Sequence, residues 1–485
     1  MKKILLFIII LSGVNLYAQQ QVSYNMLLPQ RDNNNPANTL NCNTITLPGF
    51  YIGLTSSSLR YSYLYSQDDA GKYYLDFKKI YDNLEDKNFL FTDFNVDVLG
   101  IGWWIGNYYL TINQRIKTNM NIVYPKGMVQ ILAQGNYDGN TNTVSFDGLG
   151  ANMTMYNETS IGLATEVIPN LTVGVKIKFL KGIANLNTKN FSYTLTVDDN
   201  DTLNYPITFK GYYEIQASNG VAQFNPVYDT TGTIQGIDVL DANGNEFNPE
   251  NLNSSSIKSA LLPNNGGVGV DIGINYKPIR NLNIWASVTD LGYIKWRSNA
   301  ITLHSPDTSF TFSGIDILNS EEATDEIVNS LIQMSNPEVS TDAYITYLNT
   351  KLNFGANYDI LDWINAGILY QGMFFKGKLY NYYSVNTTFN FWRGTSLALG
   401  YTNSPGGASN IGLGMSFKMG IFQWYFIADN MAPAFFGLGS VTATDYTQET
   451  FGTKLMKNAQ MMKIQFGMNL MFGCKDRRDL PLLQE

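Results

Sequence analysis

The sequence predicts an all-β protein: a closed antiparallel transmembrane β-barrel of about 14 strands, with an N-terminal plug and long extracellular loops that carry short helices. The alternation of side chains is the first reason. Between residues 409 and 418, Ile411, Leu413, Met415 and Phe417 alternate with polar or small residues, which places the two sets on opposite faces of a strand. Nearly every clear segment has such an apolar face, and none of the clear segments predicts a covering helix. A closed sheet whose apolar face meets lipid accounts for this pattern.

The lengths of the connections are the second reason. We expect strands at residues 50–65, 93–104, 108–123, 152–168, 171–187, 267–277, 281–296, 346–358, 363–375, 380–391, 395–403, 408–418, 421–430 and 461–472. Short connections (105–107, 169–170, 278–280, 359–362, 392–394 and 419–420) recur after every second strand, and most of the others are long (66–92, 124–151, 188–266, 297–345 and 431–460). Outer-membrane barrels keep short turns on the periplasmic side and long loops outside. The even strand count places both termini on the periplasmic side.

Composition is the third reason. Only 15% of the residues are charged, against about 25% in soluble globular proteins. The net charge of −8 argues against nucleic acid as a partner, because nucleic-acid binding needs a basic surface. Six of the 7 tryptophans lie near proposed short turns, which predicts an aromatic belt at one membrane boundary: Trp103, Trp104, Trp285, Trp363, Trp392 and Trp424.

The two ends of the chain carry sorting signals. Lys2 and Lys3 precede an apolar run over residues 4–14, and Ala18 offers a small residue for cleavage before Gln19, as in a secretory signal peptide. We therefore divide the chain into a signal peptide (1–18), a periplasmic or plug segment (19–48), the barrel (49–473) and a periplasmic tail (474–485). The last strand carries a polar, glycine, hydrophobic, aromatic pattern that resembles the signal read by the outer-membrane insertion machinery: Gln465, Gly467, Leu470 and Phe472.

The segment before the first strand allows two interpretations. Residues 19–48 are polar and irregular but also carry apolar side chains, so they predict a plug inside the lumen rather than a disordered tail. Pro36 fixes its own φ and biases Asn35 toward an extended shape, and we expect Asn35, Pro36 and Ala37 to lie close to the lumen wall. Cys42 and Cys474 both fall on the periplasmic side, where an oxidising compartment permits a disulfide, but two free thiols are favoured.

Charged side chains fall on the face opposite the apolar one. Period-two counting places the following residues in the lumen: Arg115, Lys117, Glu158, Glu166, Lys176, Lys178, Asp271, Lys277 and Lys351. They could line a selective passage or form a salt-bridged lattice that fills the barrel. The lattice is favoured, because alternating signs do not create a selective field.

The predicted loops suggest helices but no catalytic site. We expect helices at residues 73–84, 128–132 and 320–334. Residues 241–245 resemble a calcium loop, but Glu246 stands where that loop needs glycine, so a hairpin turn is favoured. His304 is the one histidine, and no phosphate-binding glycine loop is present, so we predict that the protein is not an enzyme and has neither metal nor cofactor.

Several short motifs together resemble a known family. They are Asn35-Pro36-Ala37, Pro125-Lys126-Gly127 with Gly135-Asn136, residues 178–182 (KFLKG), Ala428-Asp429-Asn430 and Phe472-Gly473. In this order they resemble an uncharacterised family of Bacteroidota outer-membrane barrels, across nearly the whole mature chain. That family is similar in architecture to the long-chain fatty-acid transporters and to barrel proteins that accompany type IX secretion.

The resemblance implies two classes of function. One is passive transport of a small hydrophobic solute; the alternative is a non-transporting scaffold or accessory barrel that binds a secretion or surface-protein partner. Both imply the outer membrane of a Gram-negative bacterium, contact with outer-membrane lipid, and assembly by the insertion machinery. One departure concerns release: fatty-acid transporters release ligand through a kink in the third strand, whereas residues 108–123 contain neither Gly nor Pro.

Overall fold

The computed structural model describes residues 22–68, 73–134, 143–197, 207–220, 222–241, 244–246, 264–312, 335–391, 395–403, 409–429 and 461–474. The chain forms a closed antiparallel barrel of 14 strands, as predicted. β1 (Asn43–Thr46) and β2 (Gly49–Ser56) together form the first strand of the wall. The other wall strands are β5 (Lys87–Ile105), β6 (Tyr108–Pro125), β8 (Gly150–Ile168), β9 (Leu171–Val197), β13 (Gly266–Ile279), β14 (Leu282–Trp296), β18 (Lys351–Leu361), β19 (Ile364–Phe375), β20 (Lys378–Phe391), β21 (Thr395–Asn403), β22 (Ser409–Met419), β23 (Phe422–Asp429) and β24 (Met461–Phe472).

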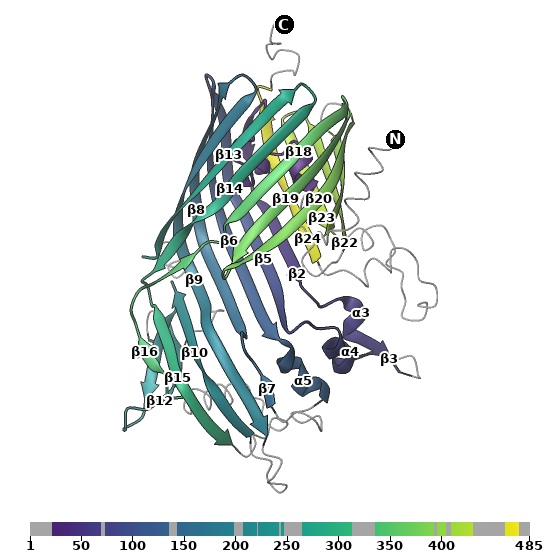
Figure 1. Ribbon diagram of the computed structural model, residues 1–485. Coiled ribbons are helices and arrows are strands. Elements are labelled where there is room, and N and C mark those ends of the chain that lie inside the picture. Colours follow the sequence, from purple (N-terminus) through teal and green to yellow (C-terminus); the bar gives the residue numbers. More distant parts are fainter. Residues whose placement is uncertain are drawn as a thin grey trace.

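The barrel closes between its first and last strands. β24 pairs with β1 from Asn43 opposite Phe472, and with β2 from Phe50 opposite Phe466. Neighbouring strands are joined at one end by short turns, which lie uppermost in Figure 1. This closure leaves the barrel wall without a free edge, as a sheet in lipid requires.

The two faces of the wall differ as the alternation predicts. In β22, Met415 and Phe417 are about half exposed, whereas Gly412, Gly414 and Ser416 are buried toward the lumen. The same holds in β8 and β9, where Ile161, Leu163, Ile177 and Phe179 point outward. These outward side chains form a continuous apolar surface suited to lipid.

The first strand differs from its prediction. The wall begins at Asn43 rather than at residue 49 or 50, because residues 43–46 already pair with the neighbouring strands. The hydrogen-bond ladder is interrupted only at Leu47 and Pro48. Proline has no N–H to donate, so it breaks the ladder without turning the chain away. The strand also ends at Ser56, and residues 61–64 form the short helix α3 (Tyr61–Leu64) instead.

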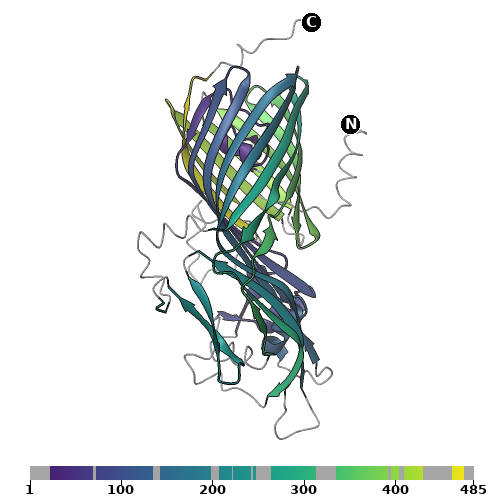
Figure 2. The same ribbon diagram turned by 90° about the vertical axis from the view of Figure 1, so that its left-hand side faces the viewer.

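A β-sheet extends the barrel on the side of the long connections (Figure 2). β9 continues beyond the wall and pairs with β7 (Thr143–Ser145) and β10 (Ile207–Asn219), β10 pairs with β15 (Ile301–Phe312), and β15 pairs with β16 (Glu338–Ser340). A separate hairpin is formed by β11 (Gln223–Tyr228) and β12 (Ile234–Leu240). The connections at 188–266 and 297–345 were predicted as loops, which is wrong for these parts, because strands in water need no apolar face and show little alternation.

Short elements complete the outer side. α5 (Lys126–Gln134) contains the predicted helix at 128–132, while residues 73–84 divide into β4 (Tyr73–Leu75), paired with β3 (Tyr65–Gln67), and α4 (Phe77–Asp82). β17 (Tyr344–Tyr347) pairs with the outer end of β14. The helix expected at 320–334 lies outside the described residues. Within the described ranges, no helix has the length and apolar character to cross a membrane.

Candidate functional site: the plugged lumen

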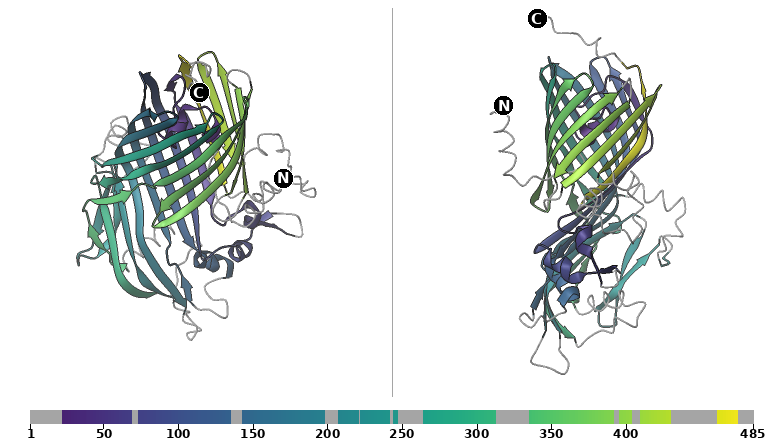
Figure 3. Two further views of the ribbon diagram at one scale, coloured as in Figure 1. Left: turned by 45° about the horizontal axis from the view of Figure 1, so that its top comes forward. Right: turned by 90° about the vertical axis from the view of Figure 1, so that its right-hand side faces the viewer.

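Residues 22–42, called the plug below, lie inside the barrel and can be seen through the wall in both views of Figure 3. The plug begins with α2 (Val22–Asn25) and continues with a 3-10 turn, η1 (Pro29–Asn33). Met26 and Leu28 are fully buried in a cluster with wall residues, and the ring of Tyr24 stacks on Trp285 at 5.1 Å. Burial of each such side chain stabilises the docked plug by about 1.5–3 kcal/mol.

The position of Trp285 corrects the predicted aromatic belt. Trp285 points into the lumen because its strand position has lumen parity, so the period of two outweighs nearness to a turn. Trp104 lies at the inner rim and donates its Nε1–H to the carbonyl of Leu40 at 2.7 Å. Outward exposure of 40–46% is found at Trp103, Trp363 and Trp424. Trp392 lies outside the described residues.

The Asn35-Pro36-Ala37 motif lies flat on two paired glycines of the wall, Gly174 of β9 and Gly273 of β13. A Cβ on Gly273 would lie 1.9 Å from Asn35 Oδ1, and one on Gly174 would lie 2.3 Å from the carbonyl carbon of Pro36. Asn35 donates to the carbonyl of Ile274 at 3.1 Å and accepts from the Ala37 N–H at 2.9 Å. The close approach therefore depends on the missing side chains of the two glycines.

Polar contacts hold the rest of the plug. Lys176 Nζ lies 2.8 Å from an oxygen of Asp32, and both side chains are almost fully buried. Arg115 donates to Asn33 Oδ1. Further hydrogen bonds join Gln30 to Asn469 (2.9 Å), Ser287 to the carbonyl of Asn34 (2.5 Å), and Asn25 to Asn386 and Asn357.

Ten of the charged residues in the lumen form a balanced ion-pair network. Five cations and five anions are paired within 4.0 Å: Arg115, Lys117, Lys176, Lys178 and Lys351 with Asp32, Asp97, Glu158, Asp271 and Asp290. Glu158, at its centre, is fully buried between cations from β6 and β9. The charges of both signs therefore neutralise one another, which is the arrangement of a lattice rather than of a selective passage.

Three anions of this network were missed by the period-two count. Asp290 has a φ of 58° and lies at a bulge where the β13–β14 register shifts, so it points into the lumen together with Thr289. Asp97 precedes a second bulge in β5. Asp32 belongs to the plug. Asp tolerates the left-handed conformation better than most residues, which was the one available signal for Asp290.

Two predicted lumen charges lie elsewhere. Glu166 is exposed at the short turn between β8 and β9, where it accepts from the N–H of Asn170 at 2.6 Å. Lys277 is exposed at the same rim, near the end of β13. Both have lumen parity, but their strands have reached the end of the barrel at these positions, so their side chains meet solvent instead of the lumen.

A cavity of about 150 Å³, called the outer cavity, lies between the plug and the wall on the side of the long connections. Its lining includes Asn33 and Asn34 of the plug and Asp93, Asn95 and Asp97 of β5. Farther out along β5, the lumen is bridged by an aromatic cluster, called the roof: Phe89, Phe91, Met373, Phe375, Tyr380 and Tyr382. Met373 belongs to both, so the roof adjoins the cavity.

The roof joins opposite sides of the barrel. The ring centroids of Phe89 and Tyr380 are 5.1 Å apart, and those of Phe91 and Phe375 are 5.3 Å apart, in edge-to-face arrangements. Lys376, at the tip of the β19–β20 hairpin, donates to the carbonyl of Thr188 in β9. The hairpin tip therefore reaches across the mouth toward β5 and β9.

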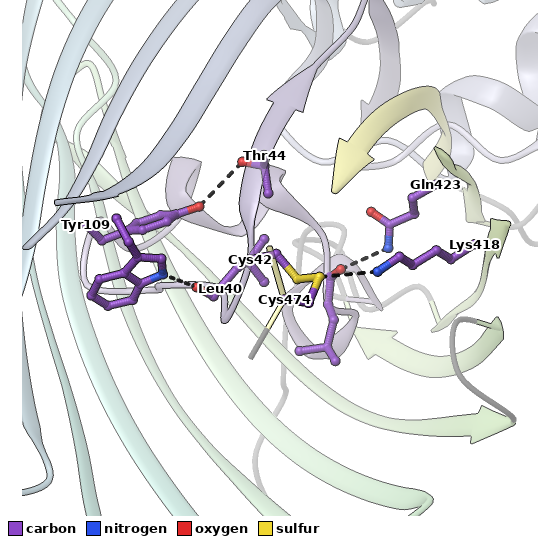
Figure 4. The surroundings of a disulfide bond; sticks show 9 residues. Leu40, Cys42, Thr44, Tyr109, Lys418, Gln423 and Cys474 are labelled. Carbon is purple, nitrogen blue, oxygen red and sulfur yellow. Dashed lines mark hydrogen bonds between the residues drawn. A yellow bond between two sulfur atoms is a disulfide. The ribbon is translucent and has the colours of Figure 1, made fainter. Parts of the chain in front are cut away.

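A disulfide joins Cys42, at the end of the plug, to Cys474, just after β24 (Figure 4). The expectation of two free thiols is therefore wrong, because the barrel closes between its first and last strands and brings the two cysteines together. Leu40 and Cys42 pack on Met471, and Lys418 Nζ lies 3.4 Å from Cys474 Sγ. The base of the plug is thus bonded covalently to the last strand.

The four residues of the terminal-strand pattern divide between the two faces of β24. Phe472 lies on the outer face, 5.5 Å from Trp103 between ring centroids, and Leu470 shares that face by parity. Gln465 faces the lumen and lines the outer cavity, and Gly467 lies against the ring of Tyr425. The proposed cleavage site at Ala18 and Gln19 and the tail from residue 475 lie outside the described residues.

The segment that resembled a calcium loop closes as a turn. Asp241 accepts from the N–H groups of Gly244 and Asn245, and its own N–H donates to the carbonyl of Asn245 at 2.7 Å. Within the part of the chain that the structure describes, no three His, Cys, Asp or Glu side chains are grouped so as to hold a metal ion.

A model of a protein family of unknown function (DUF5723) matches residues 36–429. The chain belongs to this family. No curated protein matches the sequence. Among solved structures, this DUF5723 member is similar to the toluene transporter TbuX of Ralstonia pickettii (9% identity, TM-score 0.40, covering 94% of this chain and 99% of that one). It is also similar to a FadL homologue of Pseudomonas aeruginosa (9% identity, TM-score 0.40, covering 96% of each chain).

Proposed function

We propose that the protein is a passive transporter in the outer membrane of a Gram-negative bacterium, closed at rest by its own plug. The observation that carries this is the outer cavity: the plug seals the inner half of the lumen but leaves a hollow on the side of the long connections. Polar contacts such as that between Gln30 and Asn469 can be exchanged for water when the plug moves. The apolar outer face is suited to outer-membrane lipid, and the pattern in β24 to the insertion machinery.

Deletion of residues 22–41 tests this proposal. The deletion keeps Cys42 and the wall strand β1, so the barrel should still assemble and migrate as a heat-modifiable band. Proteoliposomes with the deletion variant should swell much faster in arabinose than those with the intact protein, since the plug no longer fills the inner half of the lumen. An assembled deletion variant that swells no faster would contradict a plug-controlled pathway.

A second candidate is a scaffold that holds a secretion or surface-protein partner. The sheet formed by β9, β10 and β15 outside the barrel favours it, because this sheet projects well beyond the wall (Figure 1). Crosslinking on intact cells followed by mass spectrometry would identify such a partner. In the scaffold case, removing residues 207–241, which contain β10–β12 but no strand of the barrel wall, should abolish the crosslinks, and removing the plug should leave them in place.

The chemistry of the solute is a separate question. A small hydrophobic solute is the expectation from the family resemblance, and equilibrium binding of toluene and of arabinose to the purified protein compares the two classes of solute directly. We further propose that the protein acts without catalysis, metal or cofactor, since its one histidine, His304, lies on β15 outside the barrel.

A further inference from the structure

We propose that the outer cavity binds a small, neutral, polyhydroxylated solute of the size of a monosaccharide. This inference rests on the proposed function and deepens it, because it names the chemistry of the solute that the lumen would admit. Its basis is the hydrogen-bonding state of the residues that line the cavity.

Five of the six charged residues that line the cavity are paired with one another, and the sixth, Asp93, accepts a hydrogen bond from Asn119. Arg115 lies 3.4 Å from Asp97, Lys117 lies 3.3 Å from Asp290, and Lys351 lies 3.8 Å from Asp290. An ionic solute would have to displace a buried partner from one of these pairs, which leaves an uncompensated charge. A neutral solute avoids that cost.

Side-chain amides make up most of the uncharged lining of the cavity. Eight of the 18 lining residues are Asn or Gln: Gln30, Asn33, Asn34, Asn95, Asn119, Asn349, Gln371 and Gln465. Two of their carbonyl oxygens, Gln371 Oε1 and Asn95 Oδ1, are buried and accept no hydrogen bond from any described residue. Gln371 is only 4% exposed and is held by its Nε2, which donates to Asn353 at 2.6 Å and to Tyr24. The Oε1 atom of Gln371 is therefore held in place as a hydrogen-bond acceptor with no donor among the described residues.

Hydroxyl groups match this lining better than other groups do. A hydroxyl both donates and accepts, so a ring of hydroxyls can satisfy amide carbonyls and amide N–H groups at once. Three tyrosines, Tyr24, Tyr51 and Tyr156, offer ring surface for the C–H face of a sugar. Among the described lining residues Met373 alone is aliphatic, so a hydrocarbon would leave most of the polar lining unsatisfied.

Isothermal titration of the intact protein in detergent tests the inference, with D-glucose, D-galactose and D-xylose as probes and glycine and toluene for comparison. At least one sugar should bind saturably with a Kd of about 1 mM, the strength expected for about twelve non-hydrogen atoms at ordinary ligand efficiency. Gln371→Leu and Asn95→Leu should each weaken that binding at least tenfold. Asn107→Leu, in the exposed turn between β5 and β6, is the matched control and should leave it unchanged.

The outcomes separate this inference from the proposed function. No saturable binding of any of the three sugars, or saturable binding of glycine or toluene alone, would overturn the inference. Sugar binding that both variants leave intact would overturn the assignment to this cavity; if Gln371→Leu does not fold, Asn95→Leu decides. Sugar binding by a protein whose plug deletion fails to raise swelling would overturn transport and leave the binding site standing.

Discussion

The inner and outer halves of the lumen are built on opposite plans. In the inner half, next to the short turns, the plug touches the wall closely, as where Asn35 lies on Gly273. In the outer half the wall stands away from the plug, and the outer cavity separates the plug from the roof. The same wall strands supply both halves, so the difference comes from which residues fill the lumen positions: glycine where the plug docks, and amides, charges and aromatic rings farther out. In the proposed transporter, sealing falls to the inner half and solute binding to the outer half.

The largest effect is expected from Lys176→Met. The substitution leaves the carboxylate of Asp32 buried without its ion-pair partner, which should weaken plug docking by about 3–5 kcal/mol. The rate of trypsin cleavage at Arg31 measures docking, because Arg31 is the single Lys or Arg between residues 4 and 59. Cleavage should become much faster, while thermal unfolding of the barrel should change little.

The double variant Lys176→Met/Asp32→Asn is the control, since it removes both charges and should restore much of the protection. Unchanged cleavage in the single variant would show that sealing does not depend on this pair.

A smaller effect is expected from Gly273→Ala. Its Cβ would lie 1.9 Å from Asn35 Oδ1, so the plug must shift, at a cost of about 1–3 kcal/mol. Trypsin cleavage at Arg31 should again accelerate, though less than with Lys176→Met.

Gly269→Ala, in the same strand and on the same face, is the matched control. Its Cβ would lie 3.5 Å from the nearest atoms, an ordinary contact, and cleavage should stay at the wild-type rate. Equal cleavage rates in the two glycine variants would show that close contact with the plug at Gly273 does not distinguish the inner half of the lumen from the outer half.

The smallest effect is expected outside the barrel. Asp76 caps α4: it accepts from the N–H of Lys79 at 2.9 Å and from the hydroxyl of Ser66 at 2.6 Å, and these bonds, that of Ser66 foremost, hold the pKa of Asp76 below its ordinary value. Asp76→Ala should destabilise α4 slightly, because it removes the side-chain cap of the helix. Hydrogen exchange of the α4 amides should quicken, with no change in cleavage at Arg31.

The pH dependence of this cap has a definite sign. Because the folded pKa of Asp76 is lowered, its stabilisation is present above the unfolded pKa of about 3.9 and is lost as the pH falls through the folded pKa. The difference in α4 exchange between wild type and Asp76→Ala should therefore shrink at low pH. A difference that grows on acidification would contradict the cap.

The barrel could be predicted from the sequence because lipid imposes the period of two on every strand that crosses it. Met415 and Phe417 face outward for that reason, and the short turns follow from the ends of such runs. Where water surrounds a strand, the constraint is gone, and β10 and β15 were taken for loop. Local distortions of the strands could not be predicted from the sequence either. One bulge at Asp290 changes which residues face the lumen.

The site was harder to predict than the wall. Arg115, Lys117 and Glu158 were recognised by parity, but Asp32, which pairs with Lys176, is distant in sequence and lies in a segment with no period. The pairing of Gly174 with Gly273 depends on the register between β9 and β13, which a single sequence does not specify.

The bond between Cys42 and Cys474 turns the wall into a covalent ring. The two cysteines are 432 positions apart, so every strand of the barrel lies within one closed loop of chain, and only the residues before Cys42 and after Cys474 hang from it. A pull on the N-terminus would draw the plug out as far as Cys42, where the force is shared between β1, through the peptide bond to Asn43, and β24, through the disulfide. The disulfide therefore holds the first and last strands of the barrel together when the plug leaves the lumen, so that this movement does not open the seam between them.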